Sequence, residues 1–273
     1  MIKDVPFGLL TEPLLSWYFE NARELPWRSD PSPYRVWISE IMLQQTRVEA
    51  VRPYFERFIR ELPGIAELSR CPEDRLLKLW EGLGYYSRAR SLKETAVRIM
   101  EEYDGRMPEE YEELLSLKGI GPYTAGAISS IAFGKRAAAV DGNVFRIVTR
   151  LGKDDTDITK PSFRKEITEL LCEAMPEGNC GAFNQALMDL GATVCVPNGE
   201  PKCGECPVRE FCLARKDHSE CAYPVKPEKK KRRIEEKTVL LIRDGKRIIL
   251  QKRPDKGLLA GMYEFPNAAG HLD

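Results

Sequence analysis

The chain has 273 residues, and its 42 Lys and Arg residues balance its 42 Asp and Glu residues, so the formal net charge is zero. This length allows one large or two ordinary domains, and an apolar fraction of 42% excludes a disordered or fibrous protein. Zero net charge neither favours nor excludes nucleic acid, because binding depends on where the basic groups lie. The start of the chain lacks an export signal and no apolar run could span a bilayer, so we predict a cytoplasmic protein with no membrane partner.

From the start to about residue 220 the pattern is helical. Ser32 followed by Pro33 has the composition of a helix cap and a first-turn proline, and further Pro and Gly residues separate the apolar runs. Alternation of β-branched residues is absent, so we predict a mainly α fold for this region. The apolar positions at spacings of three and four are Leu14, Trp17 and Tyr18, then Trp37, Ile38, Ile41 and Met42, then Leu76, Leu77, Leu79 and Trp80.

Residues 117–125 contain two glycines, Gly119 and Gly121, on either side of Ile120. The glycines allow a tight turn between two helices, with Ile120 directed inward as an anchor. The exposed amides and the positive end of the following helix would then form a seat for one phosphate. Alone, this pattern is more typical of an ordinary helix–helix turn.

Four cysteines follow within eighteen residues, in the pattern Cys-x7-Cys-x2-Cys-x5-Cys: Cys195, Cys203, Cys206 and Cys212. So dense a group indicates thiolates that share a metal centre. Structural zinc usually takes two short Cys-x2-Cys pairs or a histidine pair, and here there is one such pair and the only histidines are His218 and His271. The pattern favours an iron–sulfur cluster, with zinc and unliganded thiols as alternatives. The other four cysteines are interpreted as ordinary reduced thiols.

The composition changes near Lys226, where a basic run at 229–233 is typical of a solvated linker, with a phosphate-binding arm as the alternative. Beyond it the period becomes two. The apolar segments 239–242 and 248–250 flank Asp244–Gly245, which predicts a β-hairpin. A lone hairpin is only marginally stable, so this segment is interpreted as the beginning of a second domain.

Seven segments, in the same order, resemble the adenine DNA glycosylase (MutY) family of the helix-hairpin-helix, or endonuclease III, superfamily: Pro26–Arg28, Trp37–Thr46, Gly82–Arg90, Leu117–Ala125, Val140–Val144, Phe183–Ala192 and the cysteine cluster. The resemblance implies a catalytic domain at 1–225, with a six-helix lobe at about 31–134 and an iron–sulfur lobe from 1–30 and 135–225. It further implies a basic linker at 226–236 and an incomplete Nudix-like 8-oxoguanine recognition domain at 237–273.

Three departures from the family pattern are evident. Seven residues, where six are usual, separate Cys195 from Cys203, and Lys118 stands where proline is common. The sequence also ends before the remainder of the Nudix-like domain, which puts the preference for 8-oxoguanine in doubt but not base excision.

Cleaving a purine from deoxyribose requires a proton for the leaving base and a negative charge near the cationic sugar, and two carboxylates in contrasting environments meet both needs. Glu40 is flanked by apolar residues, so burial would raise its pKa, although most helical glutamates are solvated surface residues. Asp141 alone reads as a turn-forming aspartate. The resemblance implies that Glu40 is the general acid and later the base that activates water. It also implies that Asp141 stabilises the oxocarbenium ion, and that Tyr123 and Asn143 orient the intermediate.

Tyr123 also separates two enzyme classes. The strand-nicking endonuclease III enzymes carry a lysine nucleophile at this hairpin position, and it forms a Schiff base that a phenol cannot form. Lys118 lies five residues earlier, on the other side of the turn, and is a poor substitute. The resemblance therefore implies a monofunctional glycosylase.

The same resemblance implies the DNA contacts. Gln45, Thr46, Leu83 and Tyr85 would enter the gap opposite the flipped base, although Leu83 and Tyr85 fit core packing equally well. Arg28 and Gln185 would line the adenine pocket. Gly119 and Gly121 would hold a phosphate, and the surface charges Lys202 and Arg209 are further phosphate candidates.

We therefore predict a DNA repair enzyme that flips out and removes adenine mispaired with 8-oxoguanine or guanine. It would bind duplex DNA as a monomer, associate with the nucleoid of a bacterial-type cell, and carry a [4Fe–4S] cluster that shapes a loop against DNA. Two alternatives stay open at this point: a mismatch thymine glycosylase of the same superfamily, and a non-catalytic lesion-binding protein.

Overall fold

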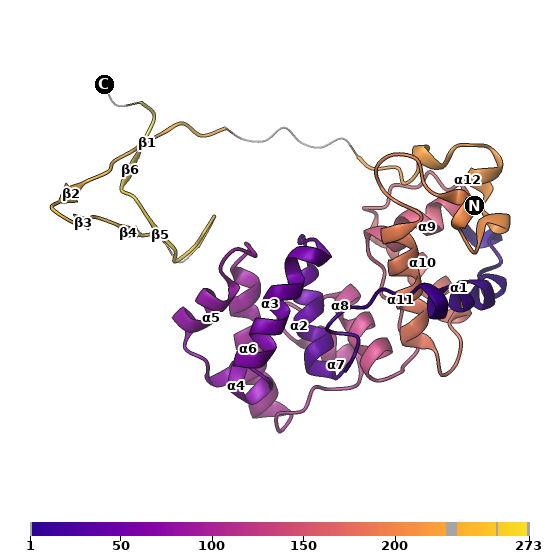
Figure 1. Ribbon diagram of the computed structural model, residues 1–273, viewed down its shortest axis with the longest axis horizontal. Coiled ribbons are helices and arrows are strands. Elements are labelled where there is room, and N and C mark those ends of the chain that lie inside the picture. The colour runs from indigo at the N-terminus through magenta and orange to yellow at the C-terminus, as the bar shows by residue number, and fades with distance from the viewer. Residues whose placement is uncertain (1, 228–233, 255, 272–273) are drawn as a thin grey trace. The chain divides into compact units, whose positions relative to one another are not determined.

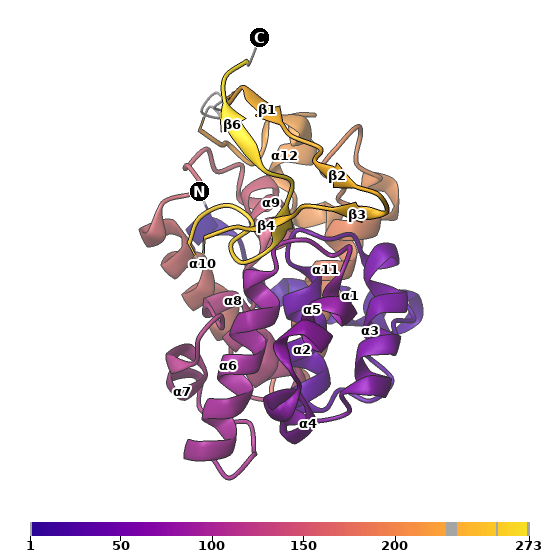
Figure 2. The same cartoon turned by 90° about the vertical axis from the view of Figure 1, so that its left-hand side faces the viewer.

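The computed structural model describes residues 2–227, 234–254 and 256–271, and it separates into two compact units, Met1–Pro227 and Glu228–Asp273. The first unit is helical, and its helices can be followed by their labels in Figures 1 and 2. These helices are α1 (Phe7–Asn21), α2 (Pro33–Leu43), α3 (Val48–Glu61), α4 (Ile65–Arg70), α5 (Glu73–Trp80), α6 (Ser87–Glu102), α7 (Tyr111–Ser116), α8 (Pro122–Ala127), α9 (Gly142–Gly152), α10 (Pro161–Ala174), α11 (Cys180–Thr193) and α12 (Leu213–Lys216). The mainly α fold predicted from the sequence is confirmed.

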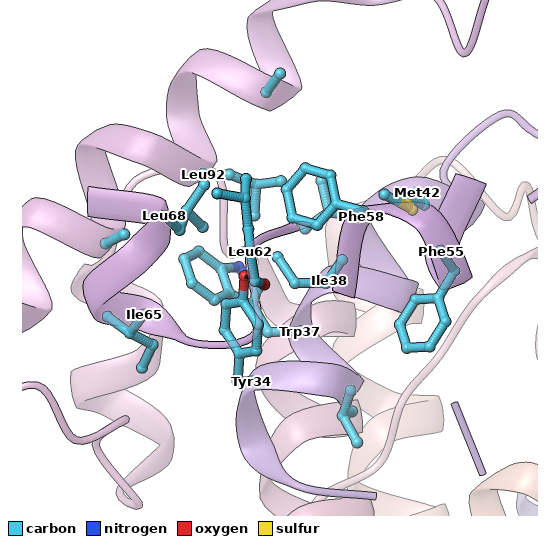
Figure 3. Close-up of a cluster of buried hydrophobic side chains, with 14 of the residues drawn as sticks. Tyr34, Trp37, Ile38, Met42, Phe55, Phe58, Leu62, Ile65, Leu68 and Leu92 are labelled. Atoms are coloured by element: carbon cyan, nitrogen blue, oxygen red, sulfur yellow. Dashed lines mark hydrogen bonds between the residues drawn. The ribbon is translucent and has the colours of Figure 1, made fainter. Parts of the chain in front are cut away.

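The helices α2 to α8 form one lobe around a continuous apolar core that extends from Leu25 to Ile128. Helix α2 begins where the sequence predicted, because the Ser32 side chain caps it and Pro33 is its first residue. Its buried Trp37 packs against the ring of Tyr34, with the centroids 6.3 Å apart, and its buried Ile38 belongs to the same apolar core as Phe55 and Phe58 of α3, all labelled in Figure 3. This packing fixes the helix that carries Glu40.

A second lobe forms around a separate apolar core, built from α1 and from the segment that contains α9, α10 and α11. Helix α11 packs against both α1 and α9, and it also contacts the helical turn Ile128–Ala132 that continues α8. Gly191 makes the contact with α9 possible, because a Cβ at this position would lie 2.5 Å from the Cβ of Asn143. The residues of α11 are thereby brought against the start of α9.

The described residues of the second unit form three short antiparallel pairs of strands. Strand β1 (Lys237–Val239) pairs with β6 (Asn267–Ala269), β2 (Arg243–Asp244) with β3 (Arg247–Ile248), and β4 (Gln251–Lys252) with β5 (Tyr263–Glu264). The predicted hairpin is present around Gly245, but its ladder is shorter than expected because Val239 pairs with β6. The basic run at 229–233 lies outside the described residues, and the predicted domain limits stay a prediction.

Among the described residues, no helix combines the length and apolarity that crossing a membrane requires.

Candidate active site

A cavity of about 460 Å³ receives side chains from both helical lobes of the first unit. Helix α2 and the turn after it line one side, and residues 23–28, the starts of α8 and α9, and the face of α11 line most of the rest. The site residues predicted from sequence that line this cavity are Arg28, Glu40, Gln45, Thr46, Tyr123, Asp141, Asn143 and Gln185. The structure therefore brings together side chains that lie up to 157 positions apart in the chain, as the numbers of Arg28 and Gln185 show.

Glu40 lies on α2, and only 5% of it is exposed to solvent. Its Oε2 accepts a hydrogen bond of 2.6 Å from the Tyr123 hydroxyl. Burial raises the pKa of Glu40 from 4.5 to about 7, and the Tyr123 hydrogen bond and Arg28 oppose this shift, whereas Asp141 adds to it. Near neutral pH this carboxyl group can therefore both give and take a proton.

Asp141 is the N-cap of α9, and its environment differs from that of Glu40. Its Oδ1 accepts from the backbone amides of Asn143 and Val144 at 2.8 and 2.9 Å, and its Oδ2 accepts from Asn143 Nδ2 at 2.8 Å. Burial raises the pKa of Asp141, but these hydrogen bonds and Arg146 oppose the rise. Three donors thus stabilise the carboxylate form beside the cavity.

Asp189 on α11 anchors Arg23 and Arg28, two arginines of the cavity, and the sequence alone did not predict this role. Its side chain is fully buried and accepts from Arg28 Nη1 and Nη2 at 2.7 and 2.9 Å and from Arg23 Nε at 2.7 Å. Burial alone would raise the pKa of Asp189, but the hydrogen bonds and charges of the two arginines lower it. The sequence feature that could have indicated this role is the position of the carboxylate. It stands between Met188 and Leu190, four residues after Gln185, in a region with a helical pattern.

Tyr18 contacts two of the residues that line the cavity, Arg28 and Gln185. The Arg28 guanidinium lies 5.7 Å from the centroid of the Tyr18 ring, and the Tyr18 hydroxyl donates to Gln185 Oε1 at 3.2 Å. The amide of Gln185 is thereby oriented, with its NH₂ group left to face another partner. Arg28 and Gln185 are thus both held by neighbours before any ligand binds.

The four clustered cysteines line one small cavity of about 30 Å³ in the second lobe, and all four are free thiols. Four thiolates are the donor set of a [4Fe–4S] cluster, so the residues present fit this group. Among the described residues, no three His, Cys, Asp or Glu side chains are gathered as around a single metal ion. Arg150 Nη1 donates to Cys195 Sγ at 3.2 Å, which places a positive charge beside the thiols.

Arg146 connects this region to the cavity. Its Nη2 donates to Asn143 Oδ1 at 2.8 Å and to the Gly191 carbonyl at 2.8 Å, and its Nε donates to the Cys195 carbonyl at 2.7 Å. Arg146 therefore holds Asn143, the hydrogen-bond partner of Asp141, and also the main chain of Cys195, the first of the four clustered cysteines. No sequence pattern marks Arg146, because three of its four acceptors are main-chain carbonyls.

The other predicted DNA-contact residues do not line the main cavity. Tyr85 is 64% exposed, whereas Leu83 is 6% exposed and packs in the core of the first lobe. Gly119 has φ of 80° and borders a separate, smaller cavity beside α2, and Gly121 is the N-cap of α8. Ile120 is buried, as the hairpin prediction required.

Residues 38–173 match the family model of the HhH-GPD superfamily of base excision DNA repair proteins. The fold is also that of a solved thermostable thymine-DNA glycosylase, at 30% identity and a TM-score of 0.71 over 77% of this chain and 97% of that one. An endonuclease III bound to DNA shares the fold at 23% identity and a TM-score of 0.65, over 80% of this chain and 98% of that one. The chain is therefore a member of the HhH-GPD superfamily.

Similar curated proteins identify the family within this superfamily. A protein of Buchnera aphidicola subsp. Schizaphis graminum named adenine DNA glycosylase is 39% identical over 93% of this chain and 73% of its own length. The mouse and human proteins of the same name are 37% and 36% identical over 93% of this chain, which spans 59% and 56% of their lengths. The chain belongs to the adenine DNA glycosylase family, and the resemblance seen in its sequence is confirmed.

Proposed function

We propose that this protein hydrolyses the N-glycosidic bond of adenine mispaired with 8-oxoguanine or guanine in duplex DNA. The observation that carries the proposal is the placement of Glu40 and Asp141 on one cavity, the first with its pKa raised to about 7 and the second holding three hydrogen-bond donors. The names of the family relatives support the choice of adenine.

The target nucleotide must leave the base stack before it can reach this cavity. Arg28 and Gln185 bind the edge of the extruded base. Asp189 holds Arg28 and Tyr18 holds Gln185, so both side chains are already in position when the base enters. Protonated Glu40 then donates its proton to the adenine ring while the glycosidic bond breaks and its electron pair leaves with the base. The cavity must also contain an anion for the cationic sugar that remains.

Asp141 supplies that anion. It stabilises the oxocarbenium ion, through a transient covalent bond to the anomeric carbon, while Asn143 holds the carboxylate in place. The Glu40 carboxylate next takes a proton from water as the water oxygen bonds to the anomeric carbon and displaces Asp141. Tyr123, which donates to Glu40, orients the acid in both steps. The products are free adenine and an abasic site.

The absence of an amine at Tyr123 supports a monofunctional enzyme. Lys118, the lysine of the hairpin, is 60% exposed and paired with Glu94 on the surface. A Schiff base at the sugar would need an amine in the cavity, and neither the Tyr123 phenol nor Lys118 provides one.

The residues around the mouth of the cavity are proposed to hold the DNA. Gln45, Thr46 and the exposed Tyr85 enter the gap that the extruded base leaves, and the hairpin at Gly119–Gly121 binds a backbone phosphate. Leu83 would join the inserting residues only by leaving its core position. A monomer bound to one mispair is sufficient for this arrangement.

A [4Fe–4S] cluster held by Cys195, Cys203, Cys206 and Cys212 is proposed as the resident cofactor. When bound, such a cluster supplies electron transfer, which glycosidic hydrolysis does not need. Lys202 lies between Cys195 and Cys203, and Arg209 lies between Cys206 and Cys212, so ordering these loops would present both side chains to DNA. We also propose that residues 237–273 are part of a Nudix-like 8-oxoguanine recognition domain.

Thymine removal from G:T pairs is the second candidate, because a solved thymine-DNA glycosylase is 30% identical over 97% of its length. Single-turnover excision on 8-oxoguanine:A, G:A and G:T duplexes, followed by alkaline cleavage of abasic sites, separates the two. We expect faster excision from both adenine mispairs. Faster G:T cleavage would establish the thymine activity instead, and tight mispair binding without any abasic product would identify a lesion-binding protein.

A further inference from the structure

Arg88, the second residue of α6, makes an unusual number of main-chain contacts. Its Nη1 donates to the carbonyls of Ile41, Met42 and Gln44 at 2.7, 3.2 and 2.6 Å. Its Nη2 donates to the carbonyls of Leu83 and Gly84 at 3.0 and 3.1 Å. One guanidinium therefore joins two chain segments that are about forty residues apart, and both segments lead into residues that we assign to DNA insertion.

The first segment is the end of α2 and the turn that follows it. The last carbonyls of a helix lack intrahelical donors, and a cation at this end is favoured by the helix dipole. Arg88 supplies both the donors and the charge. The turn continues through Gln45, whose φ of 63° is in the left-handed region that non-glycine residues adopt only when their surroundings hold them there.

The second segment is the turn between α5 and α6. Gly82, Gly84 and Tyr85 have φ values of 100°, 68° and 47°, so three of four successive residues are left-handed. The Gly84 carbonyl accepts from both Arg88 and Trp80 Nε1. These two donors hold the turn from its buried side, and Tyr85 extends from its exposed side.

Two aromatic rings flank the guanidinium. Its central carbon lies 5.4 Å from the Trp80 ring centroid and 5.6 Å from that of Tyr85. Trp80 is fully buried, whereas Tyr85 is 64% exposed. Arg88 is thus a bridge between the core of the first lobe and the exposed ring, and only the planar fork of arginine can serve both turns at once.

We propose that Arg88 is a positioning residue that joins the Gln44–Thr46 turn and the Gly82–Tyr85 turn into one preformed wedge for base extrusion. The inference rests on the proposed function, since it assigns a task in opening duplex DNA. A wedge that is ordered before binding lets the contact energy drive extrusion, because neither turn has to be ordered at that moment. A merely structural Arg88 would affect stability and leave extrusion unchanged.

The test uses Arg88→Lys, which keeps the charge but cannot span five carbonyls. Arg35→Lys is the matched control: Arg35 also donates to a carbonyl, that of Pro26, stacks on the ring of Phe55, and has a buried Nε without a hydrogen-bond partner among the described residues. Base extrusion is followed by the fluorescence of 2-aminopurine placed at the adenine position opposite 8-oxoguanine, at saturating protein. Thermal unfolding is measured alongside.

We expect Arg88→Lys to lower the extrusion equilibrium constant by about tenfold, the effect of losing one charge-assisted hydrogen bond, and Arg35→Lys to leave it unchanged at a similar loss of Tm. A second pair tests the same point without touching Arg88. Gly84→Ala and Gly134→Ala both place a Cβ in open space at nearly equal φ, 68° and 67°, so both put an alanine in the left-handed region of φ. Only Gly84→Ala should lower extrusion, because it disturbs the carbonyl that Arg88 holds.

The outcomes separate the inference from the proposed function. Wild-type protein that neither extrudes 2-aminopurine nor releases adenine would remove the proposed function itself. If the wild-type protein is active while Arg88→Lys and Gly84→Ala extrude as their controls do, the wedge role of Arg88 is wrong. If Arg88→Lys does not fold, the glycine pair decides alone.

Discussion

The pKa of Glu40 gives the most direct prediction about catalysis. Burial raises this pKa to about 7, and the reaction as proposed needs the protonated acid. Between about pH 6 and about pH 8 the protonated fraction falls from about nine-tenths to about one-tenth, so the single-turnover rate constant should fall by about tenfold.

The assay is excision with enzyme in excess over a labelled 8-oxoguanine:A duplex, stopped with alkali and resolved by electrophoresis. Glu40→Gln is the companion variant, because glutamine retains an acceptor for the Tyr123 hydroxyl but has no proton to donate. It should abolish excision and leave mispair binding intact. A rate constant that stays flat or rises from about pH 6 to about pH 8 would refute the acid role, and loss of binding in Glu40→Gln would show that this residue is structural.

The same shift in pKa has a consequence for stability. Since the folded state holds the Glu40 proton more tightly than the unfolded chain does, the contribution is fully present below about pH 4.5 and is lost as the pH rises through about 7. A shift of about 2.5 pKa units corresponds to about 3 kcal/mol. The free energy of unfolding of Glu40→Gln should therefore rise relative to that of the wild type, by up to about 3 kcal/mol, between mildly acidic and mildly alkaline pH. Urea unfolding at each pH measures this difference, and equal pH dependence of the two proteins would contradict the raised pKa.

Three further predictions concern other parts of the site. Asp189→Asn should lower the free energy of unfolding by about 3 kcal/mol in urea titrations and weaken adenine excision, because it leaves two partly buried arginines without their carboxylate; an unchanged stability would contradict this. Wild-type protein should give no covalent DNA adduct on borohydride reduction, since Tyr123 cannot form a Schiff base, and a trapped adduct would reveal an unrecognised amine. Purified protein should be brown and contain about four iron and four sulfide per chain, and Cys206→Ser should lose most of the iron; a colourless protein with stoichiometric zinc would reject the cluster.

Local features of the fold could be predicted from the sequence because each depends on neighbouring residues. The Ser32–Pro33 pair marks the start of α2, and the two glycines around Ile120 mark the hairpin before α8. The burial of Glu40 followed from its apolar neighbours on a helix, and so did the direction of its pKa shift. The strands of the second unit were predicted less well, since pairing between β1 and β6 depends on residues about thirty positions apart.

The roles given to Asp141, Tyr123 and Asn143 came from the order of the motifs and stay predictions, although all three line the same cavity as Glu40. Local patterns say little about such roles, because a turn-forming aspartate and a nucleophile have the same local signature. Only the placement of the Glu40 and Asp141 carboxyl groups in one cavity distinguishes these two residues from ordinary surface carboxylates.

By itself, the sequence determined where helices begin, which faces are apolar, and the order of motifs that defines the family. Only the tertiary structure decided which distant side chains meet: Tyr123 donates to Glu40 across 83 positions, and Arg28 pairs with Asp189 across 161. Arg88 is the clearest case, because its five acceptors are main-chain carbonyls. Every residue has such a carbonyl, so no residue type signals the contact, and only the folded path of the chain can place these acceptors around one guanidinium.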